Sequence, residues 1–319
     1  MSEKKNKTQK DKFSNSLIII TAILTMLYAL SFTKSCSSQD SREKIKTTLV
    51  NPKYKASITS IELSDATTSL NLTNRGSFWT VDTSTSSSEG NNCNFLPVSP
   101  DRIKNLMENM ITIRNLYKIS DKITEKSTFG LNNGTEFHIR YYTEDGFHEL
   151  IFGNQDFSLS SRYMMTEKSS QVYEIDNSMD TFLTTSIQSW AEPFIISQVI
   201  LGKITPQDIQ RTRVLHNYHL KEITEITDLQ KLLELRHGGI PDEDALKIIS
   251  QEQTQLPQSE ITLELGNKNE IELQIYESGN ENEFIVITQY KRQKNTEPFF
   301  ISASKISSWT YNKINEITL

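Results

Sequence analysis

Residues 135–153, TEFHIRYYTEDGFHELIFG, decide the fold. Apolar and polar side chains alternate on both sides of the turn Glu144-Asp145-Gly146. A period of two is typical of strands with one buried face, and an Asp-Gly pair between two such runs is typical of a β-hairpin. Residues 162–176, RYMMTEKSSQVYEID, repeat the pattern around Lys168-Ser169-Ser170. The sequence therefore predicts four successive antiparallel strands.

Upstream of these strands, three short segments each carry an apolar pair at positions i and i+2. The pairs are Ile61 with Leu63, Leu70 with Leu72, and Trp79 with Val81. They predict an antiparallel meander with one buried face, on which Trp79 is a core residue. Phe78 points to the opposite face, so it is the aromatic residue that we expect to meet a partner or a second unit. A polar loop is expected at 83–94.

A helix is predicted to follow this loop. Ser99 is a natural N-cap, Pro100 suits the first helical position, and Asp101 favours the positive end of a helix. The apolar side chains fall on one helical face at Ile103, Leu106, Met107 and Met110. We expect this face to cover the apolar side of the meander. A second helix, 178–190, is expected to close the unit.

The C-terminal part of the chain repeats this order of patterns. Residues 259–277, SEITLELGNKNEIELQIYE, correspond to 135–153, and residues 298–309 correspond to 171–183, with Ile301 matching Ile175. Residues 227–238 correspond to the helix at 99–110, with Asp228 as N-cap and Gly238 as stop. The sequence predicts an α+β fold of two similar units, each an antiparallel sheet with covering helices, at 54–195 and 196–319.

The N-terminal region has the pattern of a membrane anchor. Residues 16–32, SLIIITAILTMLYALSF, carry no charge and follow a lysine-rich start. At about 1.5 Å per residue this run spans about 25 Å as a helix, enough for a transmembrane segment. The predicted order is a cytoplasmic tail (1–15), a single-pass signal anchor in the cytoplasmic membrane (16–33), a polar spacer (34–53) and a periplasmic remainder. A cleaved signal peptide and a lipoprotein acylated on Cys36 are the alternatives.

Charge and cysteine usage exclude several classes of protein. The net charge is −6, and the first 32 residues carry five lysines against Glu3 and Asp11, so the remainder is more acidic still. An acidic surface does not favour binding to nucleic acid. The only cysteines are Cys36 and Cys93, without a CxxC pair, so no redox or zinc framework is indicated. The predicted fold does not depend on a disulfide between them.

One triplet resembles a catalytic motif. Arg236-His237-Gly238 is the sequence with which histidine phosphatases present a nucleophilic imidazole, but in that family it follows the first strand. Here it ends the helix that is predicted to begin at Asp228. On that placement Arg236 and His237 complement the negative helix end and Gly238 adopts the left-handed conformation. We therefore predict a structural role.

The remaining histidines are weak candidates for a site. His216, His219 and Glu222 would share one face of a helix and could bind a metal, but the surrounding segment alternates as a strand, which separates them. His138 and His148 lie in hairpin strands and are expected to face solvent. Acidic pairs occur only in the turn at 144–145 and in the predicted helix start at 241–246. GxSxG, P-loop, GxGxxG and HExxH motifs are absent, so we predict no enzyme, with no catalytic, cofactor-binding or metal-binding residues and no cofactor.

The succession SIELS, FWTVD, VSPDRIKNLMENM, TFGLN, FHELIFGN and RYMMTEKSSQVYEID resembles the domain of unknown function 4340 family. The matching positions are Trp79, Pro100, Asp101, Phe129, Gly130, Leu131, Gly153, Tyr163 and Tyr173. The likeness covers 54–195 well and the second unit as a degenerate echo. It implies a signal-anchored extracytoplasmic α+β protein, associated with accessory parts of ABC-type export or gliding-related systems.

Two functional hypotheses follow. The first is a non-enzymatic, membrane-tethered scaffold or accessory subunit that binds a protein partner, which the resemblance suggests is an ABC transporter component. The alternative is a binding module for an envelope glycan, lipid or peptide that uses a groove between the two units. Co-purification of a partner and stabilisation by a small ligand would distinguish them.

Overall fold

The computed structural model describes residues 21–26, 28, 43–83, 95–132, 134–166, 169, 171–216, 218–242 and 256–318. Within the predicted anchor these are the helical residues 21–26 and 28. The cytoplasmic tail, the rest of the anchor, the spacer up to residue 42, both cysteines and most of the loop at 83–94 lie outside the described residues. In the described part of the chain, no helix combines the length and apolarity needed to cross a membrane.

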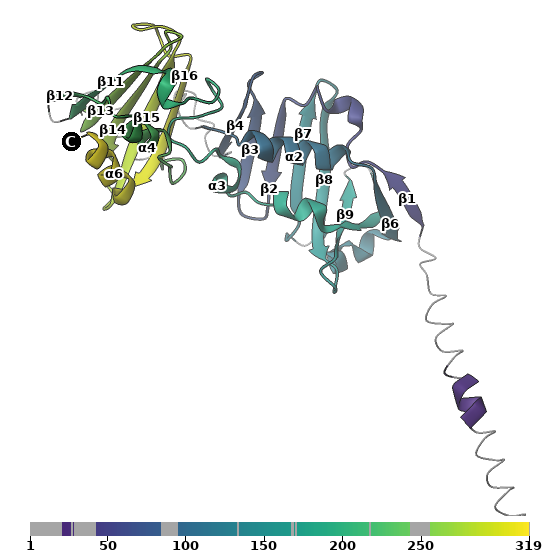
Figure 1. The fold of residues 1–319 in the computed structure, drawn as a ribbon. Helices are drawn as coiled ribbons and strands as arrows, with labels where there is room; N and C mark the ends of the chain where they lie inside the picture. Colours follow the sequence, from purple (N-terminus) through teal and green to yellow (C-terminus); the bar gives the residue numbers. More distant parts are fainter. Residues whose placement is uncertain are drawn as a thin grey trace, which may run out of the picture. The chain divides into compact units, whose positions relative to one another are not determined.

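Two antiparallel sheets form most of the compact unit Ile45–Leu319 (Figure 1). The first sheet has ten strands in the order β1-β6-β10-β9-β8-β7-β2-β3-β4-β5. Its strands are β1 (Lys44–Thr47), β2 (Ser60–Ser64), β3 (Ser69–Asn74), β4 (Trp79–Thr83), β5 (Leu96–Pro97), β6 (Arg114–Ser120), β7 (Phe137–Thr143), β8 (Gly146–Gln155), β9 (Ser161–Thr166) and β10 (Val172–Asp176). The predicted hairpin around Gly146 is confirmed as β7–β8, and the hairpin that follows it as β9–β10.

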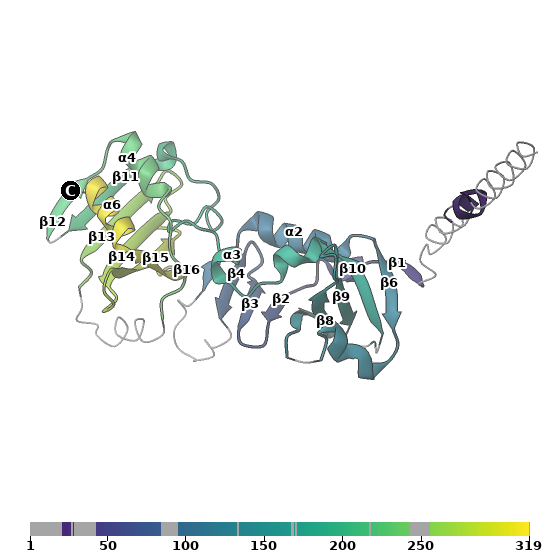
Figure 2. The same ribbon diagram turned by 90° about the horizontal axis from the view of Figure 1, so that it is seen from below.

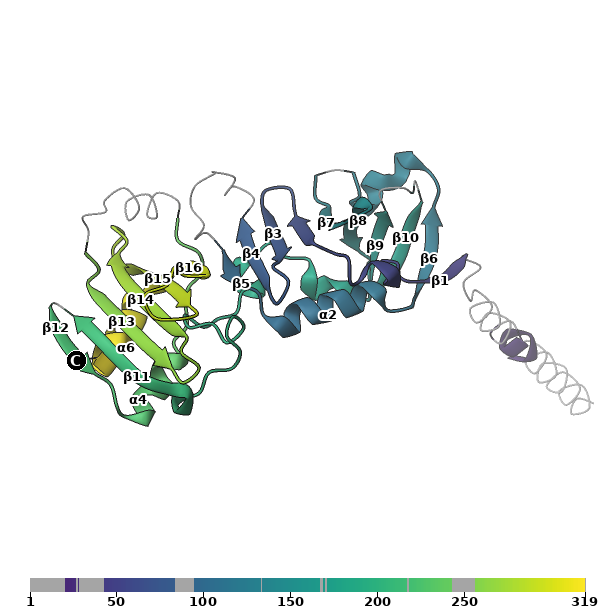
Figure 3. The same cartoon turned by 90° about the horizontal axis from the view of Figure 1, so that it is seen from above.

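The predicted meander and its covering helix are confirmed. Strands β2, β3 and β4 pair in sequence, and Ile61, Leu63, Leu70, Leu72 and Val81 are fully buried. Helix α2 (Pro100–Ile111) begins after Ser99 and buries the four apolar side chains of its predicted stripe in the same core. In Figures 1 and 3, α2 crosses the strands of the first sheet on one face. The apolar face of the sheet is buried because this helix covers it.

The helix predicted at 178–190 is wrong in its extent. The structure has two short helices there, η3 (Asn177–Phe182) and α3 (Ile187–Trp190). Between them the backbone is extended: the Trp190 indole N–H donates to the Thr184 carbonyl (2.9 Å), and the Ser186 N–H donates to Oγ1 of Thr184 (3.2 Å). Thr184 accepts both bonds, through its carbonyl and its hydroxyl group, and these bonds compete with helical ones, so the helix is interrupted.

The second sheet has six strands in the order β12-β11-β13-β14-β15-β16, all antiparallel. They are β11 (Ile209–His216), β12 (His219–Glu222), β13 (Ser259–Leu265), β14 (Glu270–Glu277), β15 (Glu283–Lys291) and β16 (Phe300–Ser307). Helices α4 (Ile226–Leu233) and α6 (Ser308–Thr318) pack against each other and contribute to the second core (Figure 2). Short 3₁₀ segments occur at Pro52–Tyr54 (η1), Ile123–Phe129 (η2) and Pro206–Asp208 (η4).

The two sheets share one strand order over six strands. Neighbouring strands follow the order β3-β2-β7-β8-β9-β10 across the first sheet and the order β12-β11-β13-β14-β15-β16 across the second. In both, the second strand of the series comes before the first in the chain, and the other four follow in chain order. Helices α2 and α4 each follow the initial hairpin of their series in the chain. The corresponding stretches 135–153 and 259–277 form β7–β8 and β13–β14.

Helix α4 differs in detail from the prediction. Its N-cap is Glu225, whose carbonyl accepts from the amides of Asp228 and Leu229, so Asp228 lies inside the first turn instead of capping it. The helix ends at Leu233, and Gly238 is not left-handed; the positive φ of 125° belongs to Gly239. Antiparallel bridges from Arg236 to Phe194 and from Gly239 to Lys305 draw the chain into extended structure before a glycine C-cap can form.

Candidate functional site

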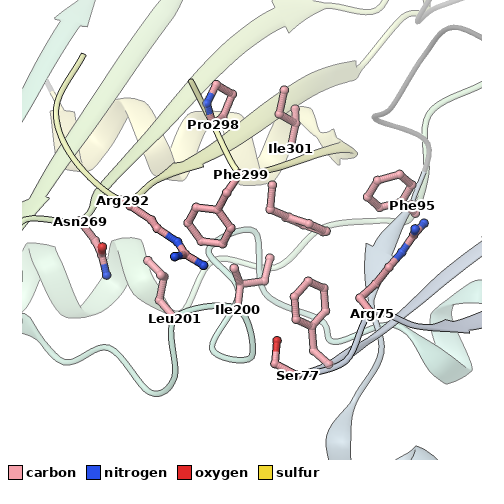
Figure 4. A pocket seen from close by; sticks show the side chains of 12 residues that line it. Arg75, Ser77, Phe95, Ile200, Leu201, Asn269, Arg292, Pro298, Phe299 and Ile301 are labelled. Atoms are coloured by element: carbon pink, nitrogen blue, oxygen red, sulfur yellow. The ribbon is translucent and has the colours of Figure 1, made fainter. Parts of the chain in front are cut away.

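A groove of about 870 Å³ lies where the two sheets meet (Figure 4). Its walls come from the β3–β4 turn, the residue before β5, the connection ahead of η4, the β13–β14 turn and the segment that leads into β16. The lining residues are Arg75, Ser77, Phe78, Phe95, Ile200, Leu201, Asn269, Arg292, Pro298, Phe299, Phe300 and Ile301. Most are aromatic or aliphatic, as is usual for a binding pocket.

An aromatic cluster forms the floor of the groove around Phe300. Its ring lies 5.2 Å from that of Phe78 in an edge-to-face arrangement (85°) and 5.5 Å from that of Phe95. Tyr290, fully buried beneath, lies 5.9 Å from the same ring. Phe300 is 8% exposed, whereas Phe299, which also lines the groove, is 42% exposed. The floor is therefore held in place by ring packing, and apolar surface remains available above it.

The adjacent aromatics Phe78 and Trp79 belong to different cores. Phe78 packs against the core of the second sheet, which confirms that it meets the second unit. Trp79 packs against the core of the first sheet, as predicted. It is only partly buried, so the prediction overstated how deeply its side chain lies in that core. The fully buried neighbour on its strand is Val81.

Two arginines supply the charge of the groove. The Arg75 guanidinium lies 5.1 Å from the ring centroid of Phe95, and that of Arg292 lies 5.4 Å from that of Phe299. In the view of Figure 4, Arg75 and Arg292 stand on either side of the aromatic side chains. Among the residues that the structure describes, no lining residue is acidic and neither arginine forms an ion pair. Within this described part of the chain, both cations are therefore available to an anionic group.

The charge of Arg75 affects the pKa of the Asp82 carboxyl group, but no salt bridge joins the two side chains. Burial raises the pKa of Asp82, and the positive charge of Arg75 partly opposes that rise. The Arg75 Nε–H instead donates to Oγ1 of Thr80 at 3.3 Å. Arg75 is thus oriented by a neutral hydroxyl group, and its terminal nitrogens are not held by a carboxylate of the described chain.

The histidines of the first sheet are not solvent-facing, contrary to the prediction. His138 is half-buried, and its Nδ1 lies 2.9 Å from Glu149 Oε1, which also accepts from Arg140 Nε at 2.6 Å. His148 stacks on Tyr141 with ring centroids 5.0 Å apart. Cross-strand pairing explains both contacts, because Tyr141 and His148 are direct partners, and Glu149 lies opposite Arg140 and diagonal to His138.

The predicted separation of His216 and His219 is also wrong. A turn containing Tyr218 (φ 65°) reverses the chain, so the two histidines are direct cross-strand partners on β11 and β12. His216 Nδ1 contacts Oγ of Ser259, and Glu222 pairs with Arg211. Among the described residues, no group of three His, Cys, Asp or Glu side chains is arranged to hold a metal ion.

The triplet Arg236-His237-Gly238 has a structural role. Nδ1 of His237 accepts from the Gly239 amide (3.1 Å), so its Nε2 carries the proton and donates to the Glu192 carbonyl (2.7 Å). Burial lowers the pKa of His237, which favours this neutral tautomer. The Arg236 guanidinium lies 5.6 Å from the Phe194 ring centroid. The triplet does not complement a helix end, because α4 stops at Leu233. The predicted acidic pair at 241–246 falls largely outside the described residues.

The family model described as Domain of unknown function (DUF4340) matches residues 91–255, just over half of the chain. The chain belongs to this family. No curated protein and no solved structure matches it. The DUF4340 range extends from β5 to α4 and includes Phe95, Ile200 and Leu201 of the groove but neither arginine. Most of the groove is therefore built by parts of the chain that the DUF4340 match does not cover.

Five of the residues that carried the DUF4340 resemblance, at 129–131, 153 and 163, form a small packing site. The Phe129 and Tyr163 rings lie 4.8 Å apart, and Leu131 is buried in the same cluster. Gly130 caps η2 in the left-handed conformation (φ 69°). Gly153 lies so close to Phe129 that a Cβ would stand 2.2 Å from the Phe129 carbonyl oxygen. These DUF4340 positions hold η2 against β8, and their role is structural.

Proposed function

We propose that this DUF4340 protein is a non-enzymatic, membrane-tethered binding subunit that holds an acidic, apolar peptide segment of a partner protein in the groove. The observation that carries the proposal is the pair Arg75 and Arg292 beside an aromatic floor, in a groove whose described lining residues include no carboxylate. Guanidinium groups bind carboxylates through charge-assisted hydrogen bonds, and an exposed phenylalanine offers apolar contact.

The charge of the whole chain supports a specific site. With a net charge of −6, most of the surface repels an acidic segment. A groove with two cations that have no ion-pair partner among the described residues is a local exception, so electrostatics favours one docking position. An open groove suits an extended peptide, whose backbone stays in contact with solvent, better than an acyl chain, which needs enclosure.

The two sheets are proposed to be diverged copies of one α+β unit. The shared strand order and the position of α2 and α4 support this view. On this account the groove arose at the junction of the copies, as binding sites commonly do between domains. The residues at its walls then belong to connections, which vary more easily than strands.

The location follows from the apolar run at 16–32, which we propose is a signal anchor in the cytoplasmic membrane that leaves residues 34–319 in the periplasm. The partner is sought first among ABC-type transport or gliding-related components. Membrane fractionation tests the tether: the full chain should resist extraction with alkaline carbonate, and a chain lacking residues 1–33 should be released. Extraction of the full chain would contradict the tether.

The binding function is tested by selection from a library of short random peptides against the full chain in mild detergent. We expect enriched peptides to combine Asp or Glu with Phe, Tyr or Leu. Loss of both guanidinium groups in a double variant, Arg75→Gln with Arg292→Gln, should weaken the selected peptides at least about tenfold, because each charge-assisted hydrogen bond contributes roughly 1.5–3 kcal/mol.

Arg211→Gln is the matched control, since Arg211 is an exposed arginine of β11 outside the groove. It should leave peptide binding unchanged. Enrichment of basic peptides, or equal binding by the double variant, would contradict the proposal. Absence of peptide enrichment together with stabilisation by an anionic lipid or a glycan would favour the alternative, a module for an envelope ligand.

A further inference from the structure

The chain passes from the first sheet to the second through residues 191–199, and both sheets hold this connection. On the side of the first sheet, the Glu192 amide donates to the carbonyl of Pro97, the last residue of β5 (2.8 Å). On the side of the second sheet, Nε2 of His237 donates to the Glu192 carbonyl (2.7 Å). The backbone of Glu192 is therefore fixed from both directions.

The side chain of Glu192 is a buried carboxylate that holds the turn after it. The residue is 6% exposed. Its Oε2 accepts from the Ser197 hydroxyl group (2.5 Å), and its Oε1 accepts from the Gln198 amide (2.8 Å). The Val199 amide donates in turn to Oγ of Ser197 (3.0 Å). Hydrogen bonds to an ionised carboxylate are about twice as strong as neutral ones, so its charge tightens this turn.

This turn supports a loop that forms one wall of the groove. Oε1 of Gln198 accepts from the Ile204 amide (2.7 Å), which closes the loop 199–203 at its base. Ile200 and Leu201, the aliphatic lining residues ahead of η4, belong to this loop (Figure 4). A continuous series of hydrogen bonds therefore leads from a buried carboxylate to the wall.

The same turn is joined to the floor of the groove. The Ser197 amide donates to the hydroxyl group of Tyr290 (2.7 Å), and the Tyr290 ring lies 5.9 Å from that of Phe300. Wall and floor are thus both connected to Ser197. Glu192 is not a lining residue, so it can act on a bound peptide only through the groups that it holds.

We propose that Glu192 is a positioning residue of the groove, whose ionised carboxylate fixes the loop that presents Ile200 and Leu201 to a bound peptide. The inference rests on the proposed peptide-binding function and adds a residue that lies outside the lining. A peptide that needs the wall in place binds more weakly by the fraction of molecules in which the wall is displaced.

The hold on the loop and the stability of the whole fold respond in opposite directions to the charge of Glu192. Burial raises the pKa of Glu192, and hydrogen bonds from Ser197, Gln198 and Val199 partly oppose that rise. The fold is therefore more stable with this group uncharged, whereas the bonds to the turn favour the ionised form. Loss of the charge should loosen the loop without lowering Tm, which a purely structural role does not predict.

Hydrogen exchange measures the hold on the loop in the full chain, in mild detergent at neutral pH. Glu192→Gln keeps the shape of the side chain and removes its charge. The amides of residues 198–204 should then exchange about fivefold faster or more, while Tm stays equal or rises. A second variant, Gln198→Leu, removes only the acceptor of the Ile204 amide and should speed exchange in the same segment.

Glu149→Gln is the matched control for both variants. Its carboxylate, on β8, is 10% exposed and contacts Nδ1 of His138 and Nε of Arg140, and it does not line the groove. It should leave exchange at 198–204 unchanged. The same exchange in Glu192→Gln as in the unmodified chain, or an equal increase in Glu149→Gln, would overturn the proposal.

Binding of the selected peptides is then measured on the same variants. Glu192→Gln should weaken binding about threefold or more although Arg75 and Arg292 are intact, and Glu149→Gln should bind as the unmodified chain does. Unchanged affinity in Glu192→Gln, or weaker binding that accompanies a lower Tm, would overturn the positioning role. If the unmodified chain selects no peptide, the proposed function fails, and the exchange rates alone decide whether Glu192 holds the loop.

Discussion

Gly153→Ala is expected to be among the most destabilising conservative substitutions in the first sheet. Gly153 lies where the β8–β9 register shifts, and a Cβ there would meet the Phe129 carbonyl oxygen at 2.2 Å and Leu131 Cγ at 2.9 Å. The carbonyl belongs to the backbone, so the clash is relieved only if η2 moves by about 1 Å, away from a packed cluster. Overpacking of this kind costs about 3 kcal/mol or more.

Thermal unfolding of the full chain by circular dichroism measures this cost. At roughly 2–4 °C per kcal/mol for a unit of this size, Gly153→Ala should lower Tm by about 6 °C or more. Gly238→Ala is the matched control, because its Cβ would make only ordinary contacts with Lys305 (O at 3.5 Å, Cγ at 3.8 Å) and its φ is not positive. It should leave Tm nearly unchanged. Equal Tm values for the two variants would refute the close-approach argument.

The remaining predictions concern the two aromatics and two titrating groups. Trp79→Ala should lower the free energy of unfolding by about 3 kcal/mol and increase hydrogen exchange in β2–β4. Phe78→Ala should lower it by about 1–2 kcal/mol and increase exchange in β15–β16. The reverse pattern would refute the assignment to separate cores. Burial lowers the folded-state pKa of His237 below the ordinary 6.5. The contribution of His237 to stability is therefore constant above pH 6.5 and decreases as the pH falls below 6.5, by at most about 1.4 kcal/mol per pH unit. His237→Gln should abolish this slope in urea titrations at several pH values. Burial would raise the pKa of Asp65, but hydrogen bonds from Thr67 and Thr68 outweigh the effect of burial and lower the pKa to about 2. Stability is therefore lost as the pH falls from 3.8 towards 2. The stability of an Asp65→Asn variant should depend less on pH over that range.

Elements with a strong local period were predictable from sequence. The stripe from Ile103 to Met110 has helical spacing and a proline at the first position, and it forms α2 as predicted. The hairpin at Gly146 was predictable because its turn carries Asp-Gly. The hairpin at Tyr218 was missed, since its turn has no glycine and the strands on both sides look like one continuous strand.

The sequence suggested a groove between the two units only as part of the alternative hypothesis, and the residues that line the groove could not be predicted because they are remote in sequence. Arg75, Phe95, Ile200 and Arg292 come from separate connections, and none lies in a periodic segment. Adjacent aromatics at 78–79 and 299–300 were the available signal, and alternation indicated that Phe78 leaves the first core. Only the packing of the two sheets brings Phe78 and Phe95 to the Phe300 ring.

The central claim is that the groove holds a peptide segment of a partner protein, and photo-crosslinking in intact cells tests it directly. Phe299, an exposed residue of the groove lining, is replaced by a photoreactive phenylalanine analogue in the full chain; Phe157, exposed on the β8–β9 loop and not among the lining residues, is replaced in a parallel strain. The account predicts one crosslinked protein at Phe299, attached through a segment containing Asp or Glu, and lost when Arg75 and Arg292 are both changed to Gln. The same products from both positions, or a product at Phe299 that persists without the two arginines, would contradict it.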